Sequence, residues 1–102
     1  MSLEKKLLKA KPVCKVKFSL SGDQYKSASS ILLVGDFNNW QLGETPLKLT
    51  KTTGVWSVSL DLETGKSYQF RYLIDGTNWE NDAEADSFIA SGLGSENSVL
   101  AI

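Results

Sequence analysis

Alternating apolar and polar residues predict short β-strands along most of this chain. Residues 13–20 have a period of two, and so do 55–62 and 67–75. Successive side chains of a strand point to opposite faces, so this period indicates strands with one buried face. The residues expected on the buried faces are Cys14, Val16, Phe18, Leu20, Trp56, Val58, Leu60, Leu62, Tyr68, Phe70, Tyr72 and Ile74. Arg71 falls on the opposite, outward face.

Other segments read as strands of different kinds. Residues 31–34 are continuously aliphatic, which indicates a strand through the core that ends at Gly35 and Asp36. Residues 47–50 resemble a short edge strand, 87–90 a brief strand and 97–102 a closing strand. About seven short strands, with turn residues about every ten positions, predict an all-β fold, an immunoglobulin-like antiparallel β-sandwich over residues 13–102.

The first twelve residues are expected to form a basic arm or a short helix. Ser2 is a possible helix cap, and Leu3, Leu7 and Leu8 would share one side of the helix. A helix of one or two turns is marginal by itself and would have to dock on the domain.

Composition restricts the chain to one small globular domain. The 102 residues are 41% apolar and 23% charged, and the net charge of −1 gives no reason to expect nucleic acid as a partner. No apolar run approaches the length of a membrane span, and the N-terminus has no apolar core of a secretory signal. We therefore expect no membrane partner and a cytoplasmic location.

The residue types present make catalysis improbable. The chain has no histidine and one cysteine, Cys14, which excludes histidine-based triads, an internal disulfide and a cysteine-rich zinc site. We expect no catalytic residue, metal or cofactor, and Cys14 in the core. The acidic run 80–86 does not fit an EF-hand and reads as a solvated loop. No pair of carboxylates stands out for glycoside hydrolysis.

Charge is distributed unevenly along the chain. Lysines are concentrated in residues 5–17, whereas residues 75–96 contain acidic but no basic side chains. The favoured interpretation is two solvated faces that partly pair within the fold. The alternative is head-to-tail contact between copies.

Four polar or aromatic residues suit the recognition of a sugar. Tryptophan rings cover the apolar face of a pyranose, and amide or guanidinium groups bond its hydroxyls. Trp40 and Trp79 follow strand ends, Arg71 points outward, and Asn97 begins the last strand. Residue types and spacing alone leave two interpretations open, because the same rings would also serve as caps on the ends of the sandwich.

Four motifs together resemble one known family. GDFNNW (35–40), GVWSVSLDL (54–62), YQFRYLIDG (68–76) and NSVL (97–100) occur in the same order in carbohydrate-binding module family 48. This family includes the glycogen-binding domain of AMP-activated protein kinase beta subunits and the N-terminal domains of isoamylases and branching enzymes. The resemblance covers residues 13–102 and implies the early-set immunoglobulin-like sandwich.

The resemblance implies a glucan-contacting role for six positions. The implied contacts are two stacking rings, a basic group, a leucine in a late loop, a hydroxyl and an amide, at Trp40, Trp79, Arg71, Leu93, Ser95 and Asn97. Arg71 stands where the kinase subunits carry lysine, and Ser95 where they carry threonine. Residues 75–79 are one residue longer than the commonest spacing.

The implied function is binding rather than catalysis. Family enzymes carry this module ahead of a barrel, and 102 residues cannot contain one. We therefore expect a free-standing, non-catalytic module that binds α-1,4-linked glucan. The alternative is a protein-interaction or scaffold module of the same fold, with a protein partner or self-association. A single domain of a larger enzyme is a weaker possibility, because the chain starts with Met1.

Overall fold

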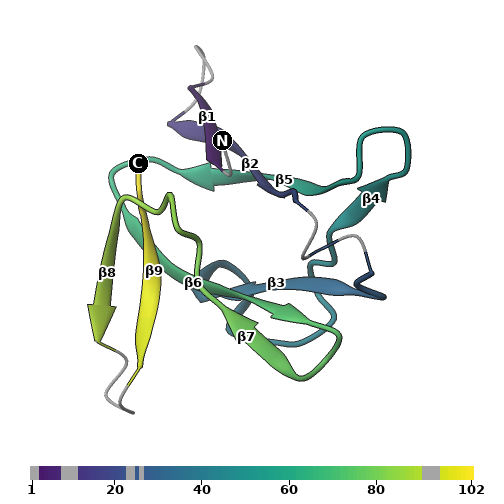
Figure 1. Ribbon diagram of the computed structural model, residues 1–102. Helices are drawn as coiled ribbons and strands as arrows, with labels where there is room; N and C mark the ends of the chain where they lie inside the picture. The colour runs from purple at the N-terminus through teal and green to yellow at the C-terminus, as the bar shows by residue number, and fades with distance from the viewer. Residues whose placement is uncertain (1–2, 8–11, 23–24, 26, 91–94) are drawn as a thin grey trace.

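Two antiparallel sheets pack face to face in the computed structural model, which describes residues 3–7, 12–22, 25, 27–90 and 95–102 (Figure 1). The first sheet has the order β1 (Leu3–Leu7), β2 (Val13–Leu20), β5 (Val55–Glu63) and β4 (Lys48–Thr50). The second has the order β3 (Ile31–Gly35), β6 (Ser67–Ile74), β9 (Glu96–Ala101) and β8 (Ser87–Ala90), with β7 (Asn78–Glu80) paired to β6. The predicted all-β sandwich is confirmed.

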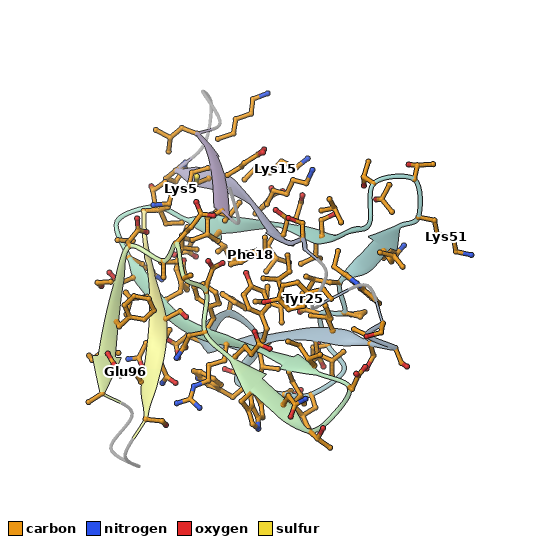
Figure 2. All side chains as sticks on the ribbon, viewed as in Figure 1. Lys5, Lys15, Phe18, Tyr25, Lys51 and Glu96 are labelled. Atoms are coloured by element: carbon orange, nitrogen blue, oxygen red, sulfur yellow. The ribbon has the colours of Figure 1, made fainter. Side chains whose placement is uncertain are left out.

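The core lies between the sheets and is built from the residues that the alternation places there. Phe70 packs edge-on against Phe18 and against Tyr72, with ring centroids 5.3 and 5.8 Å apart. Phe18 and Tyr25 are labelled between the two sheets in Figure 2. Trp56 is buried, and its indole N–H donates to the carbonyl of Tyr25. Cys14 is also buried, as expected.

Of the two forms expected for the N-terminal segment, a basic arm or a short helix, the described part adopts neither. Leu3–Leu7 forms strand β1, which pairs antiparallel with β2, and the side chain of Leu3 is buried in the core. A strand satisfies the open edge of β2, which a short helix would leave unpaired. The helix cap Ser2 and residues 8–11 lie outside the described residues.

An ion pair fastens β1 to the second sheet. Lys5 Nζ lies 2.7 Å from Asp86 Oδ2 and also donates to the carbonyl of Ala101. The basic and acidic segments of the sequence therefore meet within the fold at this point. The Asp86 carboxylate also accepts the backbone N–H of Ala101, so it links the start of β8 to β9.

The acidic run 80–86 is mostly exposed, as expected of a solvated loop, but Asp82 is an exception. The side chain of Asp82 is only 1% exposed, and its carboxylate accepts hydrogen bonds from the Tyr72 hydroxyl and the Glu84 backbone N–H. Its own backbone N–H donates to Ser98 Oγ. These bonds compensate the cost of burying a carboxylate. Burial, followed by the nearby Asp82 carboxylate, raises the pKa of the Tyr72 phenol above its usual range.

Gly35 allows the end of β3 to approach β6 closely. A Cβ at this position would lie 2.5 Å from the carbonyl oxygen of Gln69 and 2.7 Å from Phe70 Cβ. The short 3₁₀ helix η1 (Asp36–Asn38) follows directly. The Asn38 side chain closes the turn, because it accepts from Gly35 N–H and donates to the Leu33 carbonyl. The chain therefore leaves the sheet at a fixed point.

Replacing Gly35 with alanine is expected to destabilise the fold by about 2–4 kcal/mol, because a backbone carbonyl and a buried side chain would have to move. The control is Gly43→Ala, where a Cβ meets nothing within 4 Å but the backbone φ is +85°. The control should lose only about 1–2 kcal/mol through left-handed strain. Urea unfolding measures both, and equal losses would contradict the close approach at Gly35.

The ion pair of Asp86 predicts a small stability term that depends on pH. Burial alone would raise the pKa of Asp86, but the hydrogen bonds from Lys5 and Ala101 and the charge of Lys5 lower it below its ordinary value. A lowered folded-state pKa stabilises the protein above the unfolded-state pKa, and this contribution disappears as the pH falls through the folded-state value.

Asp86→Asn should therefore lower the free energy of unfolding at pH 7 by about 0.5–1 kcal/mol, since the pair is partly exposed. The deficit should vanish as the pH falls below the ordinary range of a carboxyl group. Glu44→Gln, in the exposed loop before β4, is the control and should show neither effect. Denaturant unfolding at pH 7 and at pH 2.5 measures both variants, and a deficit that persists at low pH would contradict this role.

Candidate functional site

A connected polar network lies on the outward face of the five-stranded sheet. Arg71 Nε donates to Asn97 Oδ1 at 2.6 Å, and Arg71 Nη2 donates to Ser95 Oγ at 2.7 Å. The Asn97 amide in turn donates to Gln69 Oε1 at 3.0 Å. β6 supplies Gln69 and Arg71 on alternate positions, and the pairing of β6 with β9 brings Asn97 alongside them.

This network orients Arg71 while leaving part of its hydrogen-bonding capacity unused. A guanidinium has five N–H donors, and the bonds to Asn97 and Ser95 use one on Nε and one on Nη2. No further partner of Arg71 occurs among the residues that the structure describes. The remaining N–H groups are held in a fixed plane, which suits the recognition of paired oxygen atoms on a ligand.

Trp40 is attached to the same sheet through Asp36. The indole N–H of Trp40 donates to Asp36 Oδ1 at 2.9 Å, and Asp36 Oδ2 accepts the backbone N–H of Gln69 at 2.8 Å. One carboxylate therefore connects the ring to the row of β6 that carries Gln69. The Trp40 side chain is 36% exposed and does not belong to the core.

The backbone of Trp40 has an unfavourable conformation. Asn39 and Trp40 have φ angles of 57° and 58°, in the left-handed region. This conformation costs a bulky L-residue about 1–2 kcal/mol, and such costs are concentrated at functional sites. The Trp40 N–H bond to the Gly35 carbonyl, at 2.9 Å, helps to hold this conformation.

Trp79 lies beside the other end of β6. It is the middle residue of β7 and stands directly opposite Leu73, so the two side chains share the outward face. The sequence predicted Trp79 beyond a strand end, just past the turn at Asp75 and Gly76, and the structure adds that it lies in the short strand that follows this turn. The Trp79 side chain is 47% exposed, whereas Leu73 and Val34 on this outward face are only 3% and 0% exposed. These two residues form an apolar floor outside the main core.

The outward rows of β6 arrange these groups in sequence. Gln69, linked to Trp40 through Asp36, comes first, Arg71 is next, and Leu73, opposite Trp79, is last. At about 3.3 Å per residue, the first and last rows are about 13 Å apart. An extended oligomeric ligand suits this arrangement better than a compact one.

The structure brings most of the predicted site residues into one connected region. Ser95 and Asn97 both accept hydrogen bonds from Arg71. Leu93 lies outside the described residues. Sequence reasoning missed Asp36 and Gln69, which join the predicted residues. The one sequence signal that could have identified Asp36 as part of the site is its position four residues before Trp40. For Gln69 the only such signal is its place on the outward face of β6.

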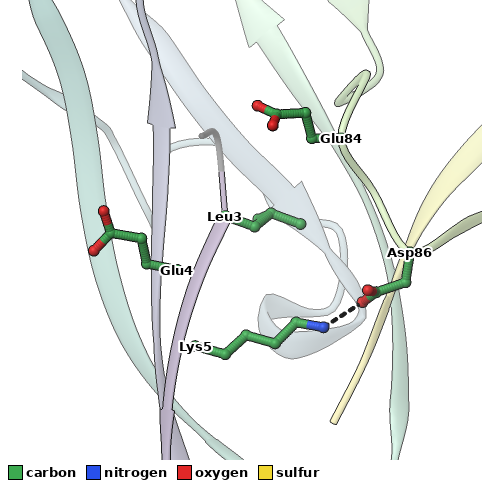
Figure 3. Close-up of a pocket in the computed structure, with 5 residues that line it drawn as sticks. All are labelled: Leu3, Glu4, Lys5, Glu84 and Asp86. Carbon is green, nitrogen blue, oxygen red and sulfur yellow. Dashed lines mark hydrogen bonds and ion pairs between the residues drawn. The ribbon is translucent and has the colours of Figure 1, made fainter.

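Three hollows are lined wholly by residues that the structure describes, and none of the three includes these site residues. One hollow, of about 530 Å³, lies between β1 and the segment before β8 and is lined by Leu3, Glu4, Lys5, Glu84 and Asp86 (Figure 3). Within the described ranges, no three His, Cys, Asp or Glu side chains gather closely enough to hold a metal ion. No helix in those ranges is long and apolar enough to cross a membrane.

Comparison with known proteins shows sequence similarity to two glucan-branching enzymes. The chain is 40% identical over 63 residues to the 1,4-alpha-glucan branching enzyme GlgB of Aquifex aeolicus, which covers 60% of this chain and 10% of that protein. It is 47% identical over 64 residues to the 1,4-alpha-glucan branching enzyme GlgB 2 of Clostridium perfringens, which again covers 60% of this chain and 10% of that protein.

A plant protein matches a longer part of the chain. Protein PTST homolog 2, chloroplastic, of Arabidopsis thaliana is 40% identical over 77 residues, which covers 74% of this chain and 13% of that protein. The chain therefore spans only about a tenth of the length of the relatives that it matches.

A family description matches the centre of the chain. The sequence model of carbohydrate-binding module 48, the isoamylase N-terminal domain, matches residues 25–89, which include Trp40, Arg71 and Trp79. Because this match covers more than half of the chain, the protein belongs to the carbohydrate-binding module 48 family.

Proposed function

We propose that this protein is a non-catalytic module that binds α-1,4-linked glucan on the outward face of the five-stranded sheet. The observation that carries the proposal is the hydrogen-bonded group of Arg71, Asn97 and Ser95, flanked along β6 by the attachment points of two exposed tryptophans. The branching-enzyme relatives support glucan as the ligand class, because their names specify 1,4-alpha-glucan.

Each part of the surface has a role in this proposal. Trp40 and Trp79 stack on the apolar faces of two sugar rings, which removes apolar area from water. The unused N–H groups of Arg71 bond sugar hydroxyls between the rings. Asp36 and Gln69 act as positioning residues, since they fix Trp40 and the Asn97 amide. By family analogy, Leu93 makes a further apolar contact.

An open face buries only part of its ligand, so the affinity should be modest. We expect a dissociation constant for maltoheptaose on the order of micromolar to millimolar. Pre-organisation supports binding in this range, because the ring of Trp40 and the plane of Arg71 are already held by hydrogen bonds.

The alternative is a protein-interaction module. It is favoured by edge strand β8, where the adjacent residues Phe88 and Ile89 are 45% and 46% exposed. Exposed apolar side chains on an unpaired edge are typical of strand addition by another chain. Self-association in sedimentation experiments, without binding of glucan, would favour this alternative.

Isothermal titration with maltoheptaose tests the glucan proposal. Trp40→Ala and Trp79→Ala should each weaken binding by about 10- to 100-fold, because each removes one stacking surface. Phe88→Ala is the matched control, since it removes another exposed aromatic ring and should leave the affinity within twofold. The absence of binding at millimolar sugar, or an equal loss in the Phe88 variant, would contradict the proposal.

Unfolding measurements show whether these losses are specific to binding. Trp40→Ala should change the free energy of unfolding by less than about 1.5 kcal/mol, because the ring is partly exposed. Trp56→Ala, which empties a buried site, should cost about 3–5 kcal/mol. A Trp40 variant as unstable as the Trp56 variant would instead identify Trp40 as a core residue.

A further inference from the structure

Lysines gather on the outward face of the other sheet. Lys6 on β1 lies directly opposite Lys15 on β2, and Lys17 follows two residues along the same face. Across β2, Ser59 on β5 stands opposite Lys17. Figure 2 shows Lys15 on the side of β2 away from Phe18, which lies between the sheets. A hollow of about 200 Å³ is lined here by Glu4, Lys5, Lys6, Lys15, Lys17 and Ser59.

The folded chain offsets only part of this positive charge, because Lys6 has another lysine and no carboxylate opposite it. Lys5 is paired with Asp86. Lys6, Lys15 and Lys17 have no ion-pair partner in the part of the chain that the structure describes, although Glu4 faces Lys17 and Asp61 faces Lys15 in register. Like charges directly opposite on paired strands destabilise a sheet. An anion between Lys6 and Lys15 would relieve this repulsion.

Protection of a sheet edge explains only part of this cluster. Lysines on an edge strand discourage pairing with other chains, and β1 is an edge strand. That role accounts for Lys6. It does not account for Lys15 and Lys17, because β2 is paired on both sides, with β1 and β5.

We propose that this hollow, on the sheet opposite the proposed sugar surface, binds a phosphate-type oxyanion. The ammonium groups of Lys6, Lys15 and Lys17 surround the anion, and Ser59 Oγ supplies a neutral hydroxyl donor. Glu4 lines one side and restricts the anion to the part of the hollow nearest Lys6 and Lys15. The phosphoryl group comes either from free phosphate or from a phosphate monoester on a sugar.

Thermal unfolding of the full chain tests this site with inorganic phosphate as the probe. In phosphate at ten times its dissociation constant, the melting temperature should rise by about 5–10 °C relative to chloride at equal ionic strength. Lys6→Gln/Lys15→Gln should lose most of this rise. The control Lys48→Gln/Lys51→Gln removes the same charge outside the hollow and should keep it. Equal rises in both double variants, or no rise in the wild type, would overturn the proposal.

Nuclear magnetic resonance titrations locate the anion and identify its source. Phosphate should shift the backbone amide signals of Lys6, Lys15 and Lys17 and leave the Trp79 indole signal in place. Equal affinity for phosphate and glucose 6-phosphate would support free phosphate as the ligand. Tighter binding of glucose 6-phosphate would support a phosphate ester of a sugar. Glucose alone should leave the lysine amides unchanged. Phosphate-induced shifts that persist in Lys6→Gln/Lys15→Gln would overturn the site.

Discussion

The junction between β3 and β6 at Gly35 and Asp36 determines where the candidate site stands. The absence of a Cβ at Gly35 lets β3 approach the Gln69 carbonyl, and the Asp36 carboxylate then bonds both Gln69 N–H and the Trp40 indole. The unfavourable backbone of Trp40 persists because these contacts over-determine it. The proposed sugar surface therefore depends on the packing of β3 against β6 at Gly35 and Gln69, although neither residue is itself proposed to contact the sugar.

The sandwich separates stability from recognition by face. The inward sides of both sheets form an aromatic and aliphatic core around Phe18, Phe70 and Tyr72. The outward side of the second sheet carries the polar network of Arg71 together with the buried apolar residues Val34 and Leu73, whereas that of the first carries lysines. Substitutions at exposed positions of the outward faces can thus change binding with little effect on the fold, because the core accounts for most of the buried apolar area.

The strands with clear alternation could be predicted from the sequence, because a period of two is a local property. β1 and β7 could not be predicted in this way. β1 forms because the edge of β2 needs a partner, and β7 has only three residues, too few to show a pattern. Asp82 was expected to be solvated because its partners Tyr72 and Ser98 lie 10 and 16 residues away in the sequence, too far for a local pattern to show them. Trp40, Arg71 and Asn97 could be selected by residue type, but the bonds that join them through Asp36 and Gln69 depend on tertiary contacts.

The most direct test of the proposed glucan surface follows the three tryptophan indole N–H signals by nuclear magnetic resonance during a titration with maltoheptaose. Trp40 and Trp79 should shift together with a single dissociation constant, and the Arg71 Nε–H signal should move with them. Trp56 is the internal reference, because its indole N–H is buried and bonded to Tyr25, and it should stay in place. Saturation that leaves the signal of Trp40 or Trp79 unmoved would contradict a shared binding surface.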